Sequence, residues 1–365
     1  MQMINCLQNS RRLTGGTRDS VTYDSEACGR HILVFGKEMQ ERISQLTIGI
    51  CSLGGLGMLL LEQLMRLYPG KLIVVDHDRV SRSNLNRLTG STYLDANLDI
   101  PKAQLAARHV WSFNPKQELT VVEGDFLELK QQEQFRECDV IFSAFDRIGP
   151  RLAANQLCEI HGITLFDVGV GAVVKDGTLQ AAGGQVIRVV PGAGFCLSCA
   201  DIYDKAEAAA DFMDMREYQN HLQMGYVRGA NIAAPQVYAL NMMTASWAVW
   251  MFMRLLAGDH CDFDGVAVDA FDWTAAPWLE ERKSVNTCPI CGNNGMALTG
   301  DDGTLLVHRR DVSPNPPTSI QDPILDRDRQ RHAESPANLT VPTDSQEIPK
   351  PEEDGSDSEI NELPI

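Results

Sequence analysis

The sequence predicts an α/β fold built on one doubly wound, mostly parallel sheet. Two observations support this prediction. Short apolar runs of strand length alternate with segments of helical spacing over most of residues 30–300, as in strands joined by crossover helices. The first apolar run enters a glycine-dense turn, and the second ends in an aspartate. That order is typical of sheets whose ligands gather beyond the carboxyl ends of the strands.

The strands and helices are expected in regular succession. Short apolar runs predict strands at 47–51, 72–75, 119–123, 139–145, 163–168 and 179–190. Helical spacing or long apolar runs predict helices at 37–46, 58–68, 102–113, 125–135 and 235–256. Thr244, Ser246 and Arg254 interrupt the last helix, so we expect it to be buried or at an interface rather than in a bilayer. Gly183 and Gly184 indicate a bulge or a close backbone approach.

The turn after the first expected strand has the sequence CSLGGLG at residues 51–57. Its three glycines let backbone N–H groups approach a phosphate, and the following helix adds the positive end of its dipole. Asp76 lies about twenty residues further on, where a ribose-binding carboxylate is expected. Ser52 stands where the first glycine of GxGxxG belongs, so a purely structural turn is the alternative. The context favours a Rossmann-like nucleotide site.

The segment after Asp76 indicates the kind of nucleotide. It holds Asp78, then SNLNR at residues 83–87, and Lys102 opens the next helix. Arginine, lysine and amide side chains suit a triphosphate, whereas a nicotinamide ring needs apolar room. Two alternatives remain open, an NAD-dependent oxidoreductase and a non-catalytic nucleotide-binding scaffold.

Several motifs taken together resemble the ThiF/MoeB/HesA family, which includes the adenylation core of ubiquitin-activating enzymes. They are GGLG at 54–57, VDHDRV at 75–80, SNLNR at 83–87, a lysine at 102 and FNP at 113–115. The resemblance covers most of residues 30–292. It implies an ATP-dependent, pyrophosphate-releasing adenylyltransferase that activates the C-terminal carboxylate of a ubiquitin-like protein. Activation of a sulfur carrier for thiamine or molybdopterin synthesis is the alternative. It also implies an antiparallel extension after the parallel strands, which holds the carrier's tail.

The resemblance assigns roles to single residues. Arg87 and Lys102 would bind phosphates, Asp76 the ribose and Asp146 the Mg²⁺ of ATP. The full expected ATP-binding set is Gly54, Gly55, Gly57, Asp76, Asp78, Asn84, Arg87, Lys102 and Asp146.

Three further positions bear on the resemblance. Arg147 follows Asp146 where the family usually has asparagine, which leaves the nearby polar contacts open. Arg151 and Asn155 match the family's Arg-xxx-Asn pattern, although a pair on a helix surface is the alternative.

A homodimer is also expected. Arg30 matches the family's arginine that reaches into the partner subunit's active site, with a solvent-facing arginine as the alternative. The apolar helix at 235–256, with Trp247, Trp250 and Phe252 on more than one face, supplies surface that a monomer would not cover.

Four of the ten cysteines form two Cys-x-x-Cys pairs, Cys196 with Cys199 and Cys288 with Cys291. Two such knuckles complete a tetrahedral site that is closed to substrate. The sequence therefore predicts structural Zn²⁺, and the family carries the same two pairs.

The remaining cysteines supply no obvious nucleophile. Cys51, Cys138 and Cys158 lie in apolar segments and are expected in the core. Cys6, Cys28 and Cys261 are the candidates for exposure, but no residue pattern activates them. The segment from 200 to 259 has no cysteine, so a thioester, and transfer to a downstream conjugating enzyme, remain open.

Composition sets the outer limits. The chain has 365 residues and a formal net charge of −17, which argues against nucleic acid or an anionic membrane as the main partner. Residues 311–365 hold four basic and thirteen acidic side chains among many prolines and serines. We expect an N-terminal extension at 1–29, an adenylation domain with the zinc site at 30–300 and a disordered acidic tail at 301–365. Residues 1–30 lack an apolar signal segment, so a cytoplasmic protein is expected.

Overall fold

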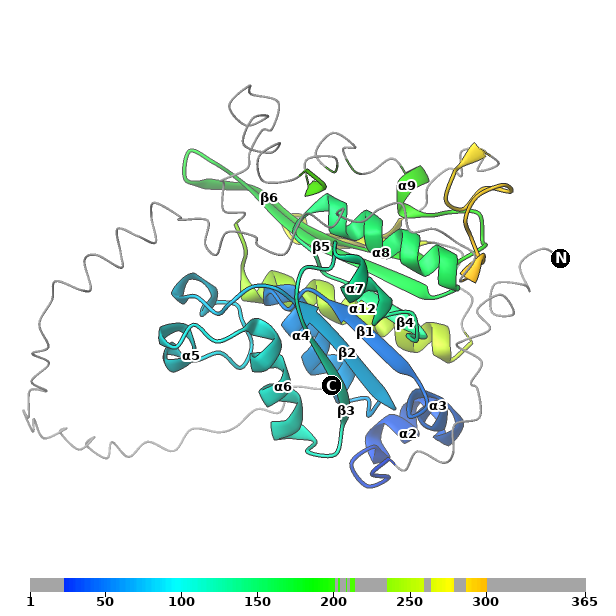
Figure 1. The fold of residues 1–365 in the computed structure, drawn as a ribbon. Coiled ribbons are helices and arrows are strands. Elements are labelled where there is room, and N and C mark those ends of the chain that lie inside the picture. The colour runs from blue at the N-terminus through cyan, green and yellow to red at the C-terminus, as the bar shows by residue number, and fades with distance from the viewer. Residues whose placement is uncertain are drawn as a thin grey trace, which may run out of the picture. The chain divides into compact units, whose positions relative to one another are not determined.

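The computed structural model describes residues 23–200, 203, 208, 211–213, 235–258, 264–278 and 287–300. Within them, one eight-stranded sheet has the strand order β3-β2-β1-β4-β5-β6-β7-β8 (Figure 1). The strands are β1 Thr47–Cys51, β2 Lys71–Asp76, β3 Glu118–Glu123, β4 Val140–Ser143, β5 Thr164–Lys175, β6 Thr178–Val189, β7 Gly265–Asp269 and β8 Thr274–Trp278. Strands β1 to β5 are parallel, and β6 to β8 continue the sheet antiparallel. The predicted fold class is confirmed.

Helices cover both faces of the parallel part. Helices α4 Gly55–Met65, α6 Lys102–Phe113 and α12 Tyr238–Leu256 share one core with Leu72 and Val74 of β2. Helix α8 Ile148–His161 shares the other core with Ile73 and Val75 of β2. Consecutive strand residues thus point into different cores, as the two-residue period requires. The carboxyl ends of β1, β2 and β4 are left at one edge between the two layers.

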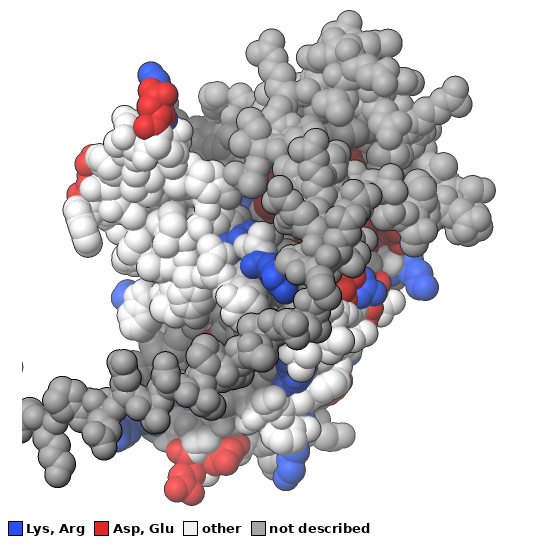
Figure 2. Space-filling model, turned by 90° about the vertical axis from the view of Figure 1, so that its left-hand side faces the viewer, with Lys and Arg blue, Asp and Glu red and all other residues white. Residues whose placement is uncertain are grey.

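The antiparallel extension is less covered. The first five residues of β5 and the last four of β6 are buried, while the hairpin end that joins them is exposed. The exposed large apolar side chains of the two hairpins are Val173, Val174, Leu179, Phe271 and Trp273. Figure 2 shows the side toward which the β5–β6 hairpin points in Figure 1, and much of the described surface there is uncharged.

Gly183 of β6 confirms the close backbone approach that the sequence predicted, because an added β-carbon there would come within 2.5 Å of the Val268 carbonyl oxygen of β7. At Gly184 the close neighbour is a side chain of α12 instead. An added β-carbon at Gly184 would come within 2.1 Å of Thr244 Oγ1 on α12. Helix α12 has 19 residues, and no described helix is long and apolar enough to cross a membrane.

The shorter elements are α2 Gly29–Phe35, α3 Lys37–Ile43, the 3₁₀ helix η1 Arg82–Asn84, α5 Tyr93–Asn97, α7 Leu129–Glu133 and α9 Leu197–Ala200. Several predicted boundaries differ by a few residues, among them the helix expected at 58–68, which is α4 at 55–65. Two of the differences have a clear physical reason. The helix expected at 125–135 is shorter because the Asp125 carboxylate accepts the Leu127 N–H and forms a turn instead. The strand expected to end at 168 continues to Lys175 because β6 pairs with it through Gly169 and Gly171.

Candidate nucleotide site and cysteine cluster

A pocket lies at the carboxyl ends of β1, β2 and β4, the edge where ligands of such sheets bind. Most of the predicted ATP-binding set lines it, namely Gly54, Gly55, Asp76, Asp78, Asn84, Arg87, Lys102 and Asp146. Gly57 and Arg30 are not among the lining residues. The lining residues that the sequence did not single out for nucleotide binding include Phe126, Arg147, Val170 and Gln236.

The glycine turn between β1 and α4 has a tight internal geometry. Ser52 adopts φ +70°, the left-handed conformation that the first glycine of the pattern would adopt without strain. An added β-carbon at Gly57 would come within 1.8 Å of the Ser52 carbonyl oxygen. At Gly54 the nearest atom would be Ser52 Oγ, 3.8 Å away. Gly57 is therefore required by the fold, whereas Gly54 leaves open space beside the pocket.

Asp76 ties this turn to the end of β2. One carboxylate oxygen accepts the Leu53 N–H at 2.5 Å, and the other accepts the Asp78 N–H at 2.7 Å. Burial raises the pKa of Asp76 above its ordinary value, against the opposing effect of Lys102. The sequence predicted a ribose ligand here. In the structure this carboxylate holds the glycine turn in shape, and its contact with a ribose stays a prediction.

Lys102 is held beside Asp78. Its ammonium lies 2.7 Å from a carboxylate oxygen of Asp78, and its side chain is 9% exposed. Burial works against the charge of Asp78, but Lys102, with smaller contributions from His77 and Arg147, lowers the pKa of this carboxyl. The first residue of α6 thus presents a charged, preoriented cation to the pocket.

Arg87 is oriented by neutral groups. Its Nε donates to Gln236 Oε1 at 2.9 Å, and Nη1 donates to the Ser83 carbonyl at 2.6 Å. Asn84 supports the same segment, because its Oδ1 accepts the Ser81 N–H at 3.2 Å. No charged partner of Arg87 is recorded among the described residues, which leaves its charge available to an anion.

Arg151 and Asn155 are buried, so the alternative of a helix-surface pair is wrong. Arg151 donates to Asp167 at 2.7 Å and also to the Phe145 carbonyl. Asn155 accepts the Leu197 N–H at 2.9 Å. Ser143 donates to the other oxygen of Asp167 at 2.9 Å, so Asp167, the fourth residue of β5, joins the end of β4 to α8. No local motif marks Asp167 in the sequence.

Arg30 lies away from the pocket of its own chain. It is an exposed residue of α2. Helices α2 and α3 precede β1 and lie at the amino end of that strand (Figure 1), whereas the pocket lies at its carboxyl end. Any contact of Arg30 with a nucleotide would therefore be made in a second subunit.

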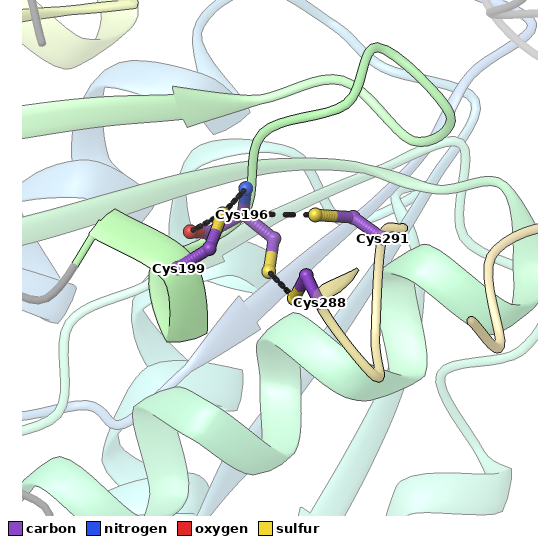
Figure 3. Close-up of side chains that lie close together, drawn as sticks. All are labelled: Cys196, Cys199, Cys288 and Cys291. Atoms are coloured by element: carbon purple, nitrogen blue, oxygen red, sulfur yellow. Dashed lines mark hydrogen bonds between the residues drawn. The ribbon is translucent and has the colours of Figure 1, made fainter. Parts of the chain in front are cut away.

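The two Cys-x-x-Cys pairs come together between α9 and the segment 287–300 (Figure 3). The sulfurs of Cys196 and Cys288 are 3.9 Å apart, and those of Cys199 and Cys291 are 3.6 Å apart. Four sulfurs at about 2.3 Å from a tetrahedral Zn²⁺ would be about 3.8 Å from one another. These two distances agree with that spacing, and all four sulfurs lie within 4.8 Å of one another, so the residues suit a tetrahedral zinc site.

The other described cysteines are buried. Cys51, Cys138 and Cys158 lie in the core, as predicted. Cys28 was a candidate for exposure, but it is fully buried, and burial together with Asp24 raises its pKa to about 11. Cys28 is therefore no activated nucleophile. Cys6 and Cys261 lie outside the described residues.

Comparison with known proteins gives a consistent result. The sequence model of the ThiF family matches residues 28–289. The SAMP-activating enzyme E1 of Haloferax volcanii is 33% identical over 273 residues, which cover 73% of this chain and 88% of that protein. The sulfur carrier protein ThiS adenylyltransferase of Bacillus subtilis is 27% identical over 265 residues, 70% and 68% of the two chains. Ubiquitin-like modifier-activating enzyme 5 of Aedes aegypti is 28% identical over 293 residues, 72% and 71%.

A crystal structure of E. coli MccB has a similar fold. It superposes with a TM-score of 0.58 at 14% identity, covering 76% of this chain and 75% of that chain. At this identity the likeness concerns the arrangement of the sheet and helices alone.

Proposed function

This chain belongs to the ThiF family, and from that premise we propose that it activates the C-terminal carboxylate of a small ubiquitin-like protein by adenylylation. The enzyme class is an ATP-dependent adenylyltransferase, as in the relatives that activate SAMP, the ubiquitin-like modifier and ThiS. One observation carries the proposal. The glycine turn, Arg87, Lys102 and Asp146 lie around one pocket at the carboxyl ends of the parallel strands.

The reaction requires charge stabilisation more than acid–base chemistry. An oxygen of the ionised carboxylate attacks the α-phosphorus, the bond to the bridging oxygen breaks, and pyrophosphate leaves with the bond's electron pair. Arg87 and Lys102 stabilise the charge that develops on the phosphates, and the N-terminus of α4 adds its dipole. Asp146 is an exposed carboxylate that lines the pocket, and it would hold Mg²⁺. When bound, the metal supplies further positive charge to the phosphate oxygens.

The carrier would approach along the antiparallel extension. Strands β5 and β6 reach outward from the pocket edge, and Val170 of β5 lines the pocket itself. The exposed apolar side chains of both hairpins suit a protein partner. Because the relatives include both kinds of enzyme, a sulfur carrier for thiamine or molybdopterin synthesis remains the alternative substrate.

We further propose a homodimer in which Arg30 acts in the partner's pocket. Helix α2 has no buried residue, and it exposes Leu33 and Val34 at 83% and 67%. Phe35 of the same helix packs on Trp250 of α12, which is itself 44% exposed. These two helices present an apolar surface that a second copy would cover. A cytoplasmic location would keep the thiolates of a zinc site reduced.

Pyrophosphate exchange into ATP tests the proposal. The exchange should require the carrier protein with its intact C-terminal tail, and a carrier that lacks its last residue should not support it. ATP binding without exchange for any candidate carrier would leave the non-catalytic scaffold. Tight NAD binding without ATP binding would indicate the oxidoreductase, although no oxidoreductase is among the relatives named above.

A further inference from the structure

Arg147 adds a cation to the pocket that none of the assigned roles uses. It lies immediately before α8, next to Asp146, and its side chain is 40% exposed. It lines the same pocket as the glycine turn, Lys102 and Arg87. Its charge also contributes to the low pKa of Asp78, the carboxylate paired with Lys102. Arg147 therefore faces the part of the pocket where the other cations lie.

One carboxylate fixes the direction of this side chain. Asp211 Oδ1 lies 3.2 Å from Arg147 Nη1, and Asp211 Oδ2 accepts the Gly149 N–H of α8 at 2.8 Å. An added β-carbon at Gly149 would come within 2.5 Å of Asp211 Cβ. Asp211 is thus seated closely on α8 by a backbone contact of its own, and its side chain is only 12% exposed.

The charges of the pocket show why this cation matters. Four carboxylates and four cations line it, the carboxylates being Asp76, Asp78, Asp125 and Asp146. Among the cations, Arg151 is already paired with buried Asp167, and Lys102 is paired with Asp78. A nucleotide triphosphate adds several negative charges at once. A partly exposed guanidinium has five N–H donors, so Arg147 can keep Asp211 and still bind an anion.

We propose that Arg147 binds the anionic part of the nucleotide and that Asp211 is its positioning residue. This inference rests on the proposed function, because it concerns the same pocket. At the position where the family usually has asparagine, Arg147 would then take part in nucleotide binding.

Calorimetric titration with Mg·ATP, without a carrier protein, tests the proposal. Arg147→Asn should weaken binding about tenfold or more, since it removes one hydrogen bond between charged groups. The affinity of Arg147→Lys for Mg·ATP should lie between those of the wild type and Arg147→Asn. Arg136→Asn is the matched control, because Arg136 is 38% exposed and is also paired with a carboxylate, that of Glu133. The control should bind as the wild type does.

Asp211→Asn tests the positioning role. This variant should weaken Mg·ATP binding by a smaller factor than Arg147→Asn does. It should have no added effect in an Arg147→Asn background. In the exchange assay both changes should raise the KM for ATP more than they lower kcat. Equal binding by wild type and Arg147→Asn would overturn the nucleotide contact. Tighter binding by Asp211→Asn, or additive effects, would overturn the positioning role. Failure of the wild type to bind ATP would instead refute the proposed function.

Discussion

Gly57 lies directly against the carbonyl group of Ser52, so close that a β-carbon on Gly57 would come within 1.8 Å of the carbonyl oxygen. Gly54, three residues earlier, has no such neighbour, because its nearest atom would be 3.8 Å away. The two glycines of one turn therefore serve different purposes. Gly57 permits α4 to pack against the end of β1, and Gly54 leaves room for a phosphate.

The pair Gly57→Ala and Gly54→Ala should separate these purposes. Gly57→Ala should lower the free energy of unfolding by about 2 kcal/mol or more, because the backbone of Ser52 must move. Gly54→Ala should leave stability nearly unchanged, since Gly54 has an extended backbone with φ −67° that alanine adopts, yet it should weaken ATP binding. Urea unfolding and calorimetry measure the two effects. Equal loss of stability in both variants would contradict this account.

Lys102 should be essential for turnover. Lys102→Met removes the preoriented cation, so exchange should fall by roughly a hundredfold or more. The matched control is Lys71→Met, because Lys71 is also mostly covered, with 15% exposure, and is also paired with a carboxylate, Glu137, at 2.6 Å. Lys71 begins β2 at the end of the strand away from the pocket. If both variants lost activity equally, the effect would be one of folding and not of catalysis.

One Zn²⁺ per chain is expected. Elemental analysis of protein purified without added metal should give a ratio near one, and Cys288→Ser should reduce it and unfold the segment around the site, because structural zinc contributes roughly 10 kcal/mol of apparent binding energy. Cys158→Ser alters a buried cysteine outside the cluster, so its zinc content should stay at one. Folded, active wild-type protein without metal would exclude the site.

Glu159 should make the fold less stable as the pH rises. Burial raises the pKa of Glu159 to about 8 from an ordinary value of 4.5, and its Oε1 has no recorded hydrogen-bond partner in the described structure. The folded state therefore binds a proton more tightly than the unfolded state between these values. The stability that the protonated Glu159 side chain contributes is fully present below about pH 4.5 and is lost as the pH rises to about 8.

Glu159→Gln should remove this dependence. The variant should be more stable than wild type by roughly 1–3 kcal/mol at pH 8, and the difference should shrink toward pH 5. Denaturant unfolding at several pH values is the measurement. Glu62→Gln, a partly exposed carboxylate on α4 with 22% exposure, is the control and should show a smaller effect. A difference that grows toward low pH would have the wrong sign.

The sequence predicted the parts of the site that are encoded locally. The glycine turn, Asp76 and the helix that begins at Lys102 follow from short motifs and helical spacing, and the observed bounds of α6 agree with the expected 102–113. The zinc cluster was also predictable, because each Cys-x-x-Cys pair is a local turn and only thiolate chemistry is needed to join them.

The partners of the arginines could not be predicted. Arg151 meets Asp167 across 16 positions, Arg147 meets Asp211 across 64, and Arg87 meets Gln236 across 149. These contacts arise only because the sheet brings the ends of distant segments to one edge. A single aspartate or glutamine is not part of a sequence motif that would identify it as the partner of a distant arginine.

Arg30 should complete the site of the other subunit. The geometry of one chain leaves Arg30 at the amino end of β1 and Asp146 at the carboxyl end of β4, so the two cannot serve one nucleotide within a single subunit. Arg30→Ala and Asp146→Ala should each abolish exchange as homodimers. A mixture of the two variants, unfolded together and refolded, should recover up to a quarter of wild-type activity, because half of the dimers are mixed and each has one competent site. Arg30→Ala alone, carried through the same refolding, is the control and should stay inactive. A monomer by light scattering at the assay concentration, or a mixture that stays inactive while the refolded wild type recovers, would show that Arg30 does not act in trans.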